Sequence, residues 1–176
     1  MILEALYYFL PAYFANVVPP LFKWLPILDK PIDFDKKFRG KPLFGPNKTI
    51  RGFLISCLFG MVIFHIQKLL YNYSFFQKIS IINYQEQTIW LGFLLGFGAI
   101  FGDLVKSFFK RRIAIPSGKP WIPFDQLDFV IGAFLFSSII FLPSIDIILI
   151  IIILSPFLQL IFHYLGYVLG INKDKI

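Results

Sequence analysis

Cysteine is nearly absent, because Cys57 is the only one among the 176 residues of the sequence. A single cysteine excludes a disulfide framework within the chain, and its place in an apolar run predicts a small buried hydrophobic side chain. Histidine is scarce too, and His65 has no second histidine, cysteine or carboxylate at the spacing of a metal site. We therefore interpret His65 as an interfacial residue rather than a ligand.

Charged residues are also few. They make up 15% of the sequence, whereas 57% of the residues are hydrophobic and 23 are phenylalanine. With a mean hydropathy of +0.74, the chain is too apolar for a soluble domain and has the composition of a polytopic membrane protein. We expect no cleavable signal peptide, because the first apolar run is long and lacks a basic leading segment and a small-residue cleavage site.

Five apolar runs are long enough to enter a bilayer, and they predict an all-α, polytopic integral membrane protein. We expect residues 1–176 to form a single domain, a bundle of about five transmembrane helices with two charged loops. The predicted spans are residues 2–28, 52–71, 89–109, 125–142 and 145–169.

The first of these runs is interrupted by polar and helix-breaking residues, namely Pro11, Asn16, Pro19 and Pro20. They predict a kinked or broken helix whose freed carbonyls face protein or a wet cavity. Asn16 would either form a hydrogen bond between helices or line a substrate cleft, together with the glycine-rich third run.

The third run contains two GxxxG spacings, one at Gly92 and Gly96 and the other at Gly98 and Gly102. Glycines at this spacing let a neighbouring backbone approach closely. We interpret them first as packing positions. They would also allow a homodimer, although they do not require one.

The distribution of the 17 basic residues predicts the orientation in the membrane. Lysine and arginine crowd the loop before the second span, the loop between the third and fourth spans, and the tail with Lys173 and Lys175. Lys68 and Lys78 fall on the other side. We expect a multi-pass protein of the cell membrane, with its N-terminus outside and its C-terminus and both charged loops in the cytoplasm. We expect no nucleic-acid partner.

The first charged loop, residues 29–51, ends in the sequence GPNKTIRG. Gly45 and Pro46 predict a turn, after which Asn47 or Thr49 can cap the next helix. Lys48 and Arg51 would then extend from its first turn, where exposed N–H groups and two cations make a phosphate site. For the other charges of this loop we expect a solvated face; they are Asp29, Lys30, Asp33, Asp35, Lys36 and Lys37.

The second charged stretch, residues 102–128, carries acids at both ends. In a helix, one face would hold Asp103, Lys106, Ser107 and Lys110, while Asp125 and Asp128 would share a face of the next helix. If the two helices are antiparallel neighbours, the acids meet at one membrane surface among Lys106, Lys110, Arg111, Arg112 and Lys119. Such carboxylates could share a divalent cation beside bound phosphates, or could form interfacial salt bridges with these lysines and arginines.

Ser107, Lys110 and Arg111, followed by Asp125 and Asp128, resemble the S-x-x-K-R and D-x-x-D signature of the CTP-dependent phosphatidate cytidylyltransferases. The sequence is more similar still to the archaeal branch of that family, the CDP-archaeol synthases. That similarity covers four stretches in order, PAYFANVVP, GPNKTIRG, GDLVKSFFKRR and FDQLDFVIGA. The Lys-Asp pair and His-Gly-Gly element of the bacterial and eukaryotic enzymes are missing, which favours an ether-lipid substrate.

The resemblance implies a nucleotidyltransferase that moves CMP from CTP to a lipid phosphate and releases pyrophosphate in phospholipid biosynthesis. The implied lipid is the unsaturated archaeal 2,3-bis-O-geranylgeranyl-sn-glycerol 1-phosphate, and the implied cofactor is Mg²⁺. On this hypothesis Asp103, Asp125 and Asp128 hold the metal. The phosphates would be bound by Lys48, Arg51, Lys106, Lys110 and Arg111, with Asn47, Thr49 and Ser107 as hydrogen-bond donors.

Other functions stay open at this point. A phosphatidate cytidylyltransferase would use ester lipids, and a CTP-dependent polyprenol kinase would release CDP instead of pyrophosphate. The CDP-alcohol phosphotransferase class is disfavoured, since Phe129 stands where that pattern has glycine. A small transporter would place charges inside its spans and often shows an inverted repeat, whereas this chain keeps nearly all of its charges at one membrane surface.

Overall fold

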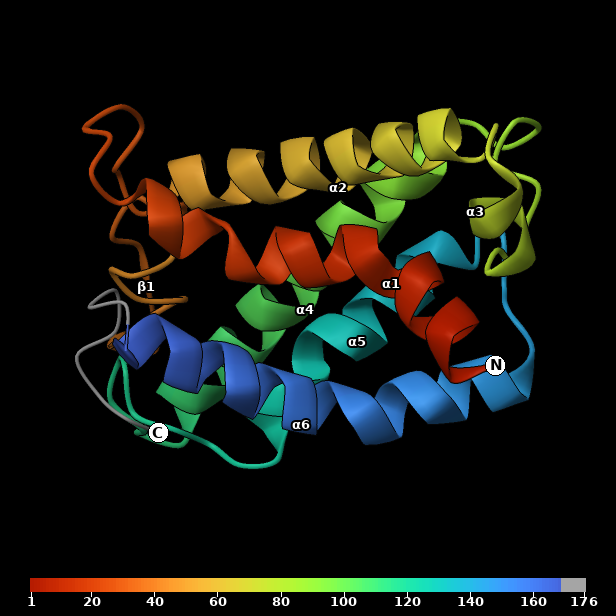
Figure 1. The fold of residues 1–176 in the computed structure, drawn as a ribbon. Coiled ribbons are helices and arrows are strands. Elements are labelled where there is room, and N and C mark those ends of the chain that lie inside the picture. The colour runs from red at the N-terminus through yellow and green to blue at the C-terminus, as the bar shows by residue number, and fades with distance from the viewer. Residues whose placement is uncertain (169–176) are drawn as a thin grey trace.

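The computed structural model describes residues 1–168, which form a bundle of helices (Figure 1). The helices are α1 (Ile2–Val17), α2 (Ile50–Leu70), α3 (Ser74–Lys78), α4 (Trp90–Arg112), α5 (Phe124–Ser137) and α6 (Ile145–Val168). A 3-10 helix, Pro19–Phe22, follows α1, and a small antiparallel hairpin joins β1 (Lys37–Phe38) to β2 (Lys41–Pro42). The prediction of a helical membrane protein is confirmed, and α2, α4 and α6 are each long and apolar enough to cross a bilayer.

Two predicted spans are longer than the helices that occupy them. The first was expected over residues 2–28, but α1 ends at Val17 because Pro19 and Pro20 provide no N–H groups to continue it. The fourth was expected over residues 125–142, but α5 ends at Ser137, six residues before Pro143. At 1.5 Å per residue, α1 and α5 are roughly 20–25 Å long, shorter than the hydrocarbon core of a typical bilayer.

The helices are arranged with α2 and α6 on opposite sides and with α1, α4 and α5 between them (Figure 1). Helix α4 is the central element, because it packs against α1, α2 and α5. Large apolar side chains fill the space between these helices, including Tyr8, Phe9, Leu91, Leu95 and Phe129, all of which are fully buried. This core fixes the position of α4, which carries much of the charged stretch.

Glycines bring the backbones of α4 and its neighbours into direct contact. A Cβ atom on Gly96 would lie 2.6 Å from the carbonyl oxygen of Ser56 in α2. On the other side of α4, a Cβ atom on Gly102 would overlap the carbonyl oxygen of Asp128, and one on Gly98 would overlap that of Gly132. The GxxxG spacings are therefore used inside the chain, for packing α4 against α2 and α5, so they do not support a homodimer.

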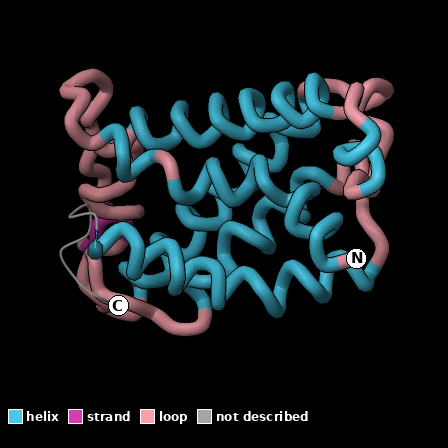
Figure 2. The backbone as a smooth tube through the Cα atoms, in the orientation of Figure 1, coloured by secondary structure: helices cyan, strands magenta, loops and turns pink. Residues whose placement is uncertain are grey.

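The loops gather at the two ends of the bundle (Figure 2). Residues 18–49 and residues 113–123 lie at the same end, whereas α3 and the N-terminus lie at the opposite end (Figures 1 and 2). Both charged loops are thus neighbours in space, although residues 50–112 separate them in the chain. The candidate functional residues of both loops meet at this end.

Candidate active site

Three carboxylates surround one ammonium group at the loop-bearing end of the bundle. The Nζ atom of Lys106 lies 3.0 Å from Asp103 Oδ1, 2.9 Å from Asp125 Oδ1 and 2.6 Å from Asp128 Oδ2. The Lys106 side chain is only 12% exposed. The structure therefore brings the three predicted acids together, and it places a lysine at their centre.

The geometry of α4 and α5 explains this convergence. Asp103 and Lys106 are three residues apart in α4, so their side chains share a face and hydrogen-bond at 3.0 Å. Asp125 and Asp128 occupy the first two turns of α5 with the same spacing. Because Gly102 lets the backbone of α5 approach α4 at Asp128, carboxylates from both helices reach the same ammonium group.

Two further lysines complete the cluster. Lys48, from the first charged loop, lies 2.5 Å from Asp103 Oδ2. Lys110 lies 3.1 Å from both oxygens of Asp125 and also donates a hydrogen bond to the carbonyl oxygen of Lys119. Three carboxylates and three ammonium groups therefore balance in charge. We call these six residues the ionic cluster: Lys48, Asp103, Lys106, Lys110, Asp125 and Asp128.

The carboxylates of the ionic cluster have the chemistry of a divalent cation site. Carboxylate oxygens are the preferred ligands of Mg²⁺, and the side chain of Asp128, which is 6% exposed, pairs through Oδ2 with Lys106. Among the described residues, however, no group of three or more histidine, cysteine, aspartate or glutamate side chains is positioned to hold a metal ion as it stands. The donor set fits a divalent cation, provided that the ammonium group of Lys106 leaves the centre.

The GPNKTIRG turn is held by a residue for which we expected a solvated position. Asp33 is 5% exposed, and its Oδ2 atom accepts hydrogen bonds from the backbone N–H groups of Phe44 and Gly45 at 2.9 and 3.3 Å. The expectation was wrong because these donors satisfy a buried carboxylate. No local pattern reveals the pairing, since the partners lie eleven and twelve residues along the chain.

The same turn leads into α2 as predicted, with Thr49 as the capping residue. Its Oγ1 atom accepts a hydrogen bond from Gly52 N at 3.1 Å. Arg51, which we expected at the phosphates, is buried and pairs with Asp29 at 2.5 Å while donating to the carbonyl oxygen of Leu25. Much of its hydrogen-bonding capacity is thus used in holding residues 25–29 against α2.

Two neighbouring arginines at the end of α4 have different surroundings. Arg111 is 9% exposed, its Nε atom has no hydrogen-bond partner, and within residues 1–168 no carboxylate lies at ion-pair distance from it. Arg112 instead donates to the carbonyl oxygens of Phe38 and Lys41 in the hairpin, at 2.5 and 3.2 Å. A buried arginine without an acidic partner favours an anionic ligand, so Arg111 points to a phosphate site.

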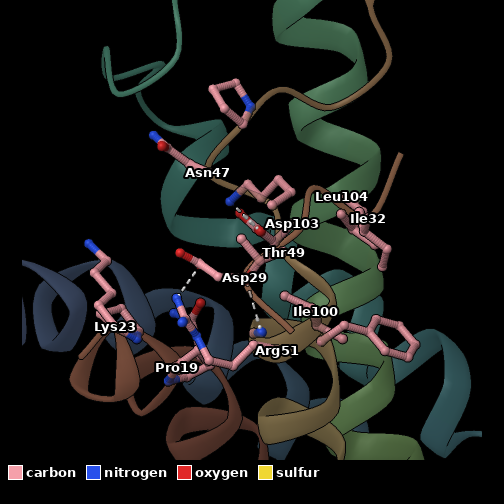
Figure 3. A pocket seen from close by; sticks show the side chains of 16 residues that line it. Pro19, Lys23, Asp29, Ile32, Asn47, Thr49, Arg51, Ile100, Asp103 and Leu104 are labelled. Atoms are coloured by element: carbon pink, nitrogen blue, oxygen red, sulfur yellow. Dashed lines mark hydrogen bonds and ion pairs between the residues drawn. The ribbon is translucent and has the colours of Figure 1, made fainter. Parts of the chain in front are cut away.

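Two cavities flank the ionic cluster. The larger, about 580 Å³, is lined by polar residues that include Asn16, Thr49 and Asp103, and by apolar ones such as Phe53 and Ile100. Figure 3 shows Asp103 and the ion pair of Asp29 with Arg51 around this cavity. The prediction that Asn16 borders a cleft is consistent with this position.

The smaller cavity, about 280 Å³, lies on the other side of Lys48. Its walls contain Ser107, Lys110, Arg111 and Lys119, so most of its polar lining is cationic. Asn47 and Lys48 line both cavities. All eleven predicted site residues therefore line one of the two cavities or belong to the ionic cluster between them.

Comparison with known proteins agrees with this arrangement. The sequence matches the model of a family described as CarS-like, CDP-archaeol synthase, over residues 1–175. The CDP-archaeol synthase of Methanocaldococcus jannaschii is 37% identical over 173 residues, which are 98% of this chain and 96% of that protein. The chain belongs to the CDP-archaeol synthase family. The resemblance to the archaeal branch is confirmed.

Other members of the CDP-archaeol synthase family are similar over nearly their whole length. The one from Thermococcus kodakarensis is 38% identical over 167 residues, which are 94% of this chain and 91% of that protein. A solved structure, described as insight into an intramembrane enzyme for archaeal membrane lipids biosynthesis, superimposes with a TM-score of 0.71 at 26% identity. It covers 96% of this chain and 95% of that one. The helical fold is therefore shared with that intramembrane enzyme.

Proposed function

We propose that the protein transfers CMP from CTP to an archaeal ether-lipid phosphate, giving CDP-archaeol and pyrophosphate. The lipid substrate on this proposal is 2,3-bis-O-geranylgeranyl-sn-glycerol 1-phosphate. Its family membership supports the reaction, and one structural observation carries it: two cavities share Lys48, beside buried cations that can hold phosphates. A reaction between two phosphate-bearing substrates needs an arrangement of this kind.

The reaction joins two anions. An oxygen of the lipid phosphate forms a bond to the α-phosphorus of CTP, and the bond from that phosphorus to the oxygen bridging to the β-phosphate breaks, so that the electron pair leaves with pyrophosphate. No general base is required, because the attacking phosphate is already an anion near neutral pH. The protein must instead offset the repulsion between the substrates and the charge that develops on the leaving group.

The cations of the site are suited to that task. Lys48 lies where both cavities meet, so it can contact both reacting phosphates. Lys110 and Arg111 line the smaller cavity, where they can bind the phosphates of one substrate, and Ser107 is buried beside them. Asp103, Asp125 and Asp128 would hold Mg²⁺, which when bound supplies further charge stabilisation to the transferring phosphate.

The charged loops at this end of the bundle also indicate how the protein is oriented in the membrane. We propose that the charged loops face the cytoplasm, where CTP is made, and that the N-terminus lies outside. Lysine and arginine are frequent in residues 18–49 and 110–119. Such loops usually face the cytoplasm, which supports this orientation. The tail with Lys173 and Lys175, on which the predicted orientation also rests, lies outside the described residues.

A direct assay tests the reaction. Purified protein is incubated with Mg²⁺, CTP labelled at the α-phosphate and digeranylgeranylglyceryl phosphate, and both lipid-extractable label and pyrophosphate are measured. We expect label in the lipid phase with equimolar pyrophosphate. Phosphatidic acid in place of the ether lipid tests the ester-lipid alternative, and a polyprenol with release of CDP tests the kinase. Absence of labelled lipid with both lipid phosphates would contradict the proposal.

Paired variants test which substrate enters which cavity. Asn16→Leu alters the larger cavity and Ser117→Leu the smaller one, and neither residue belongs to the ionic cluster. If each cavity receives one substrate, one variant raises the KM for CTP and the other raises the KM for the lipid. Equal effects of both variants on both KM values would contradict two separate cavities for two substrates.

A further inference from the structure

We propose that Lys106 is an internal counterion that takes the position of the divalent cation in the free protein, so that metal and nucleotide bind together rather than separately. This inference rests on the proposed function. It concerns what Lys106 does before the reaction begins, and it predicts a measurable coupling between two ligands.

The first observation is the position of the ammonium group. Lys106 Nζ lies within 3.0 Å of oxygens from Asp103, Asp125 and Asp128. An ion shared by these three carboxylates would have to occupy nearly the same point. The ammonium group and a divalent cation therefore exclude each other, both by volume and by repulsion between like charges.

The second observation is that one ammonium group serves three carboxylates. Lys106 donates a hydrogen bond to Asp103, and its Nζ atom lies 2.9 Å from Asp125 Oδ1 and 2.6 Å from Asp128 Oδ2. An ammonium group carries one positive charge and three N–H donors, whereas Mg²⁺ carries two charges and binds about six oxygen ligands. A divalent cation at the same point would therefore offset more of the negative charge of the three carboxylates than Lys106 does.

The third observation is the charge of the cluster. Lys48, Lys106 and Lys110 balance the three carboxylates in the free protein, so a divalent cation entering alone would leave two excess positive charges in a largely buried site. Nucleotide phosphates supply compensating negative charge. Lys106 also lines the smaller cavity, next to Lys110 and Arg111, so its ammonium group can turn toward bound phosphates when the metal takes its place.

Direct binding of Mn²⁺, followed by electron paramagnetic resonance without lipid, tests the coupling. In the wild-type protein we expect CTP to tighten Mn²⁺ binding at least tenfold, and CTP binding to be tightened equally by Mn²⁺, as linkage requires. Lys106→Met removes the competing charge. We expect this variant to bind Mn²⁺ without nucleotide at least tenfold more tightly than wild type, with the additional effect of CTP reduced.

Lys78→Met is the matched control, since Lys78 is exposed at the opposite end of the bundle, and it should behave as wild type. If Lys106→Met does not fold, Lys106→Gln provides a second neutral variant with a hydrogen-bond donor. Equal Mn²⁺ affinity of the wild-type and neutral variants without CTP would overturn the inference. A failure of the proposed function would look different, because wild type would then form no labelled lipid, whatever its metal binding.

Discussion

At the end of the bundle that carries the charged loops, the buried polar groups are ions, with three carboxylates and three lysines close together. At the opposite end they include neutral hydroxyls and the amide of Gln67. Tyr7, Tyr8 and Tyr84 are almost fully buried there, and their hydroxyl oxygens have no hydrogen-bond partner. Burial raises the pKa of Tyr84, so this hydroxyl stays protonated at neutral pH.

The surroundings of the two groups differ as well. The Tyr84 ring packs against Phe64 and Tyr7, with ring centroids 5.3 and 5.7 Å apart, whereas the ionic cluster borders two cavities. Aromatic packing encloses the Tyr84 ring, although a third cavity of about 390 Å³, lined by Glu4 and Lys78 among others, lies at the same end. The charged groups of the ionic cluster, by contrast, face cavities on two sides. Polar burial by itself does not identify a functional site; convergent charge next to a cavity does.

The largest effect should come from removing one acid of the ionic cluster. Asp128→Asn keeps the shape of the side chain but removes its charge, and we expect CMP transfer to fall at least about 100-fold because several kcal/mol of charge stabilisation are lost. Asp146→Asn, at the exposed start of α6, is the control and should retain wild-type activity. Turnover of the Asp128 variant above about a tenth of the wild-type rate would contradict a role of Asp128 in metal binding.

The two neighbouring arginines allow a sharper version of the comparison. Arg111→Met should lower kcat/KM by about 10- to 100-fold, since a hydrogen bond to a charged group contributes about 1.5–3 kcal/mol. Arg112→Met should reduce thermal stability more than kcat/KM, because Arg112 holds the hairpin. Steady-state kinetics with both substrates and a melting curve in detergent measure both effects. Similar kinetic losses in the two variants would show that the cavity position of Arg111 has no special role.

A pair of glycine substitutions separates packing from catalysis. Gly102→Ala and Gly60→Ala both force a methyl group against backbone atoms, so each should lower the free energy of unfolding by roughly 1–3 kcal/mol. Gly102→Ala also moves Asp128 away from Asp103, and its transfer rate should fall tenfold or more. Gly60→Ala should keep the rate once the protein is folded. A Gly102 variant with normal turnover would mean that the spacing of the acids is not critical.

The smallest effect is expected at the aromatic end. Tyr84→Phe removes a buried hydroxyl that has no partner, so the free energy of unfolding should change by less than about 1 kcal/mol, in either direction, and the transfer rate should stay the same. Chemical or thermal denaturation in detergent measures the first and the CMP assay the second. A tenfold loss of activity would show that the two ends of the bundle are coupled.

Sequence spacing predicted the convergence of Asp103, Asp125 and Asp128, because two i, i+3 pairs on consecutive helices need only one antiparallel contact to meet. It also predicted the turn before α2 and its cap. The position of Lys106 at the centre was not predicted, since the helical spacing places it on the same face as Asp103 but does not say where its long side chain ends. That depends on the distance between α4 and α5.

Contacts between distant residues were beyond sequence reasoning. Asp33 is buried because N–H groups eleven and twelve residues away donate hydrogen bonds to it, and Arg112 is bound by a hairpin seventy or more residues earlier. The end of α5 was misjudged for a simpler reason. Residues 138–142 are as apolar as the helix before them, and hydrophobicity does not distinguish the last turn of a helix from an apolar loop.

The backbone contact between Gly102 and Asp128 has a consequence for how this protein can diverge in evolution. Side chains that touch substrate can be replaced by others of similar charge, whereas position 102 accepts no side chain at all without displacing α5. In a randomised library of α4 selected for growth on this activity, Gly98 and Gly102 should tolerate fewer replacements than Lys110. Part of the information that specifies the chemistry therefore resides in residues that take no part in it.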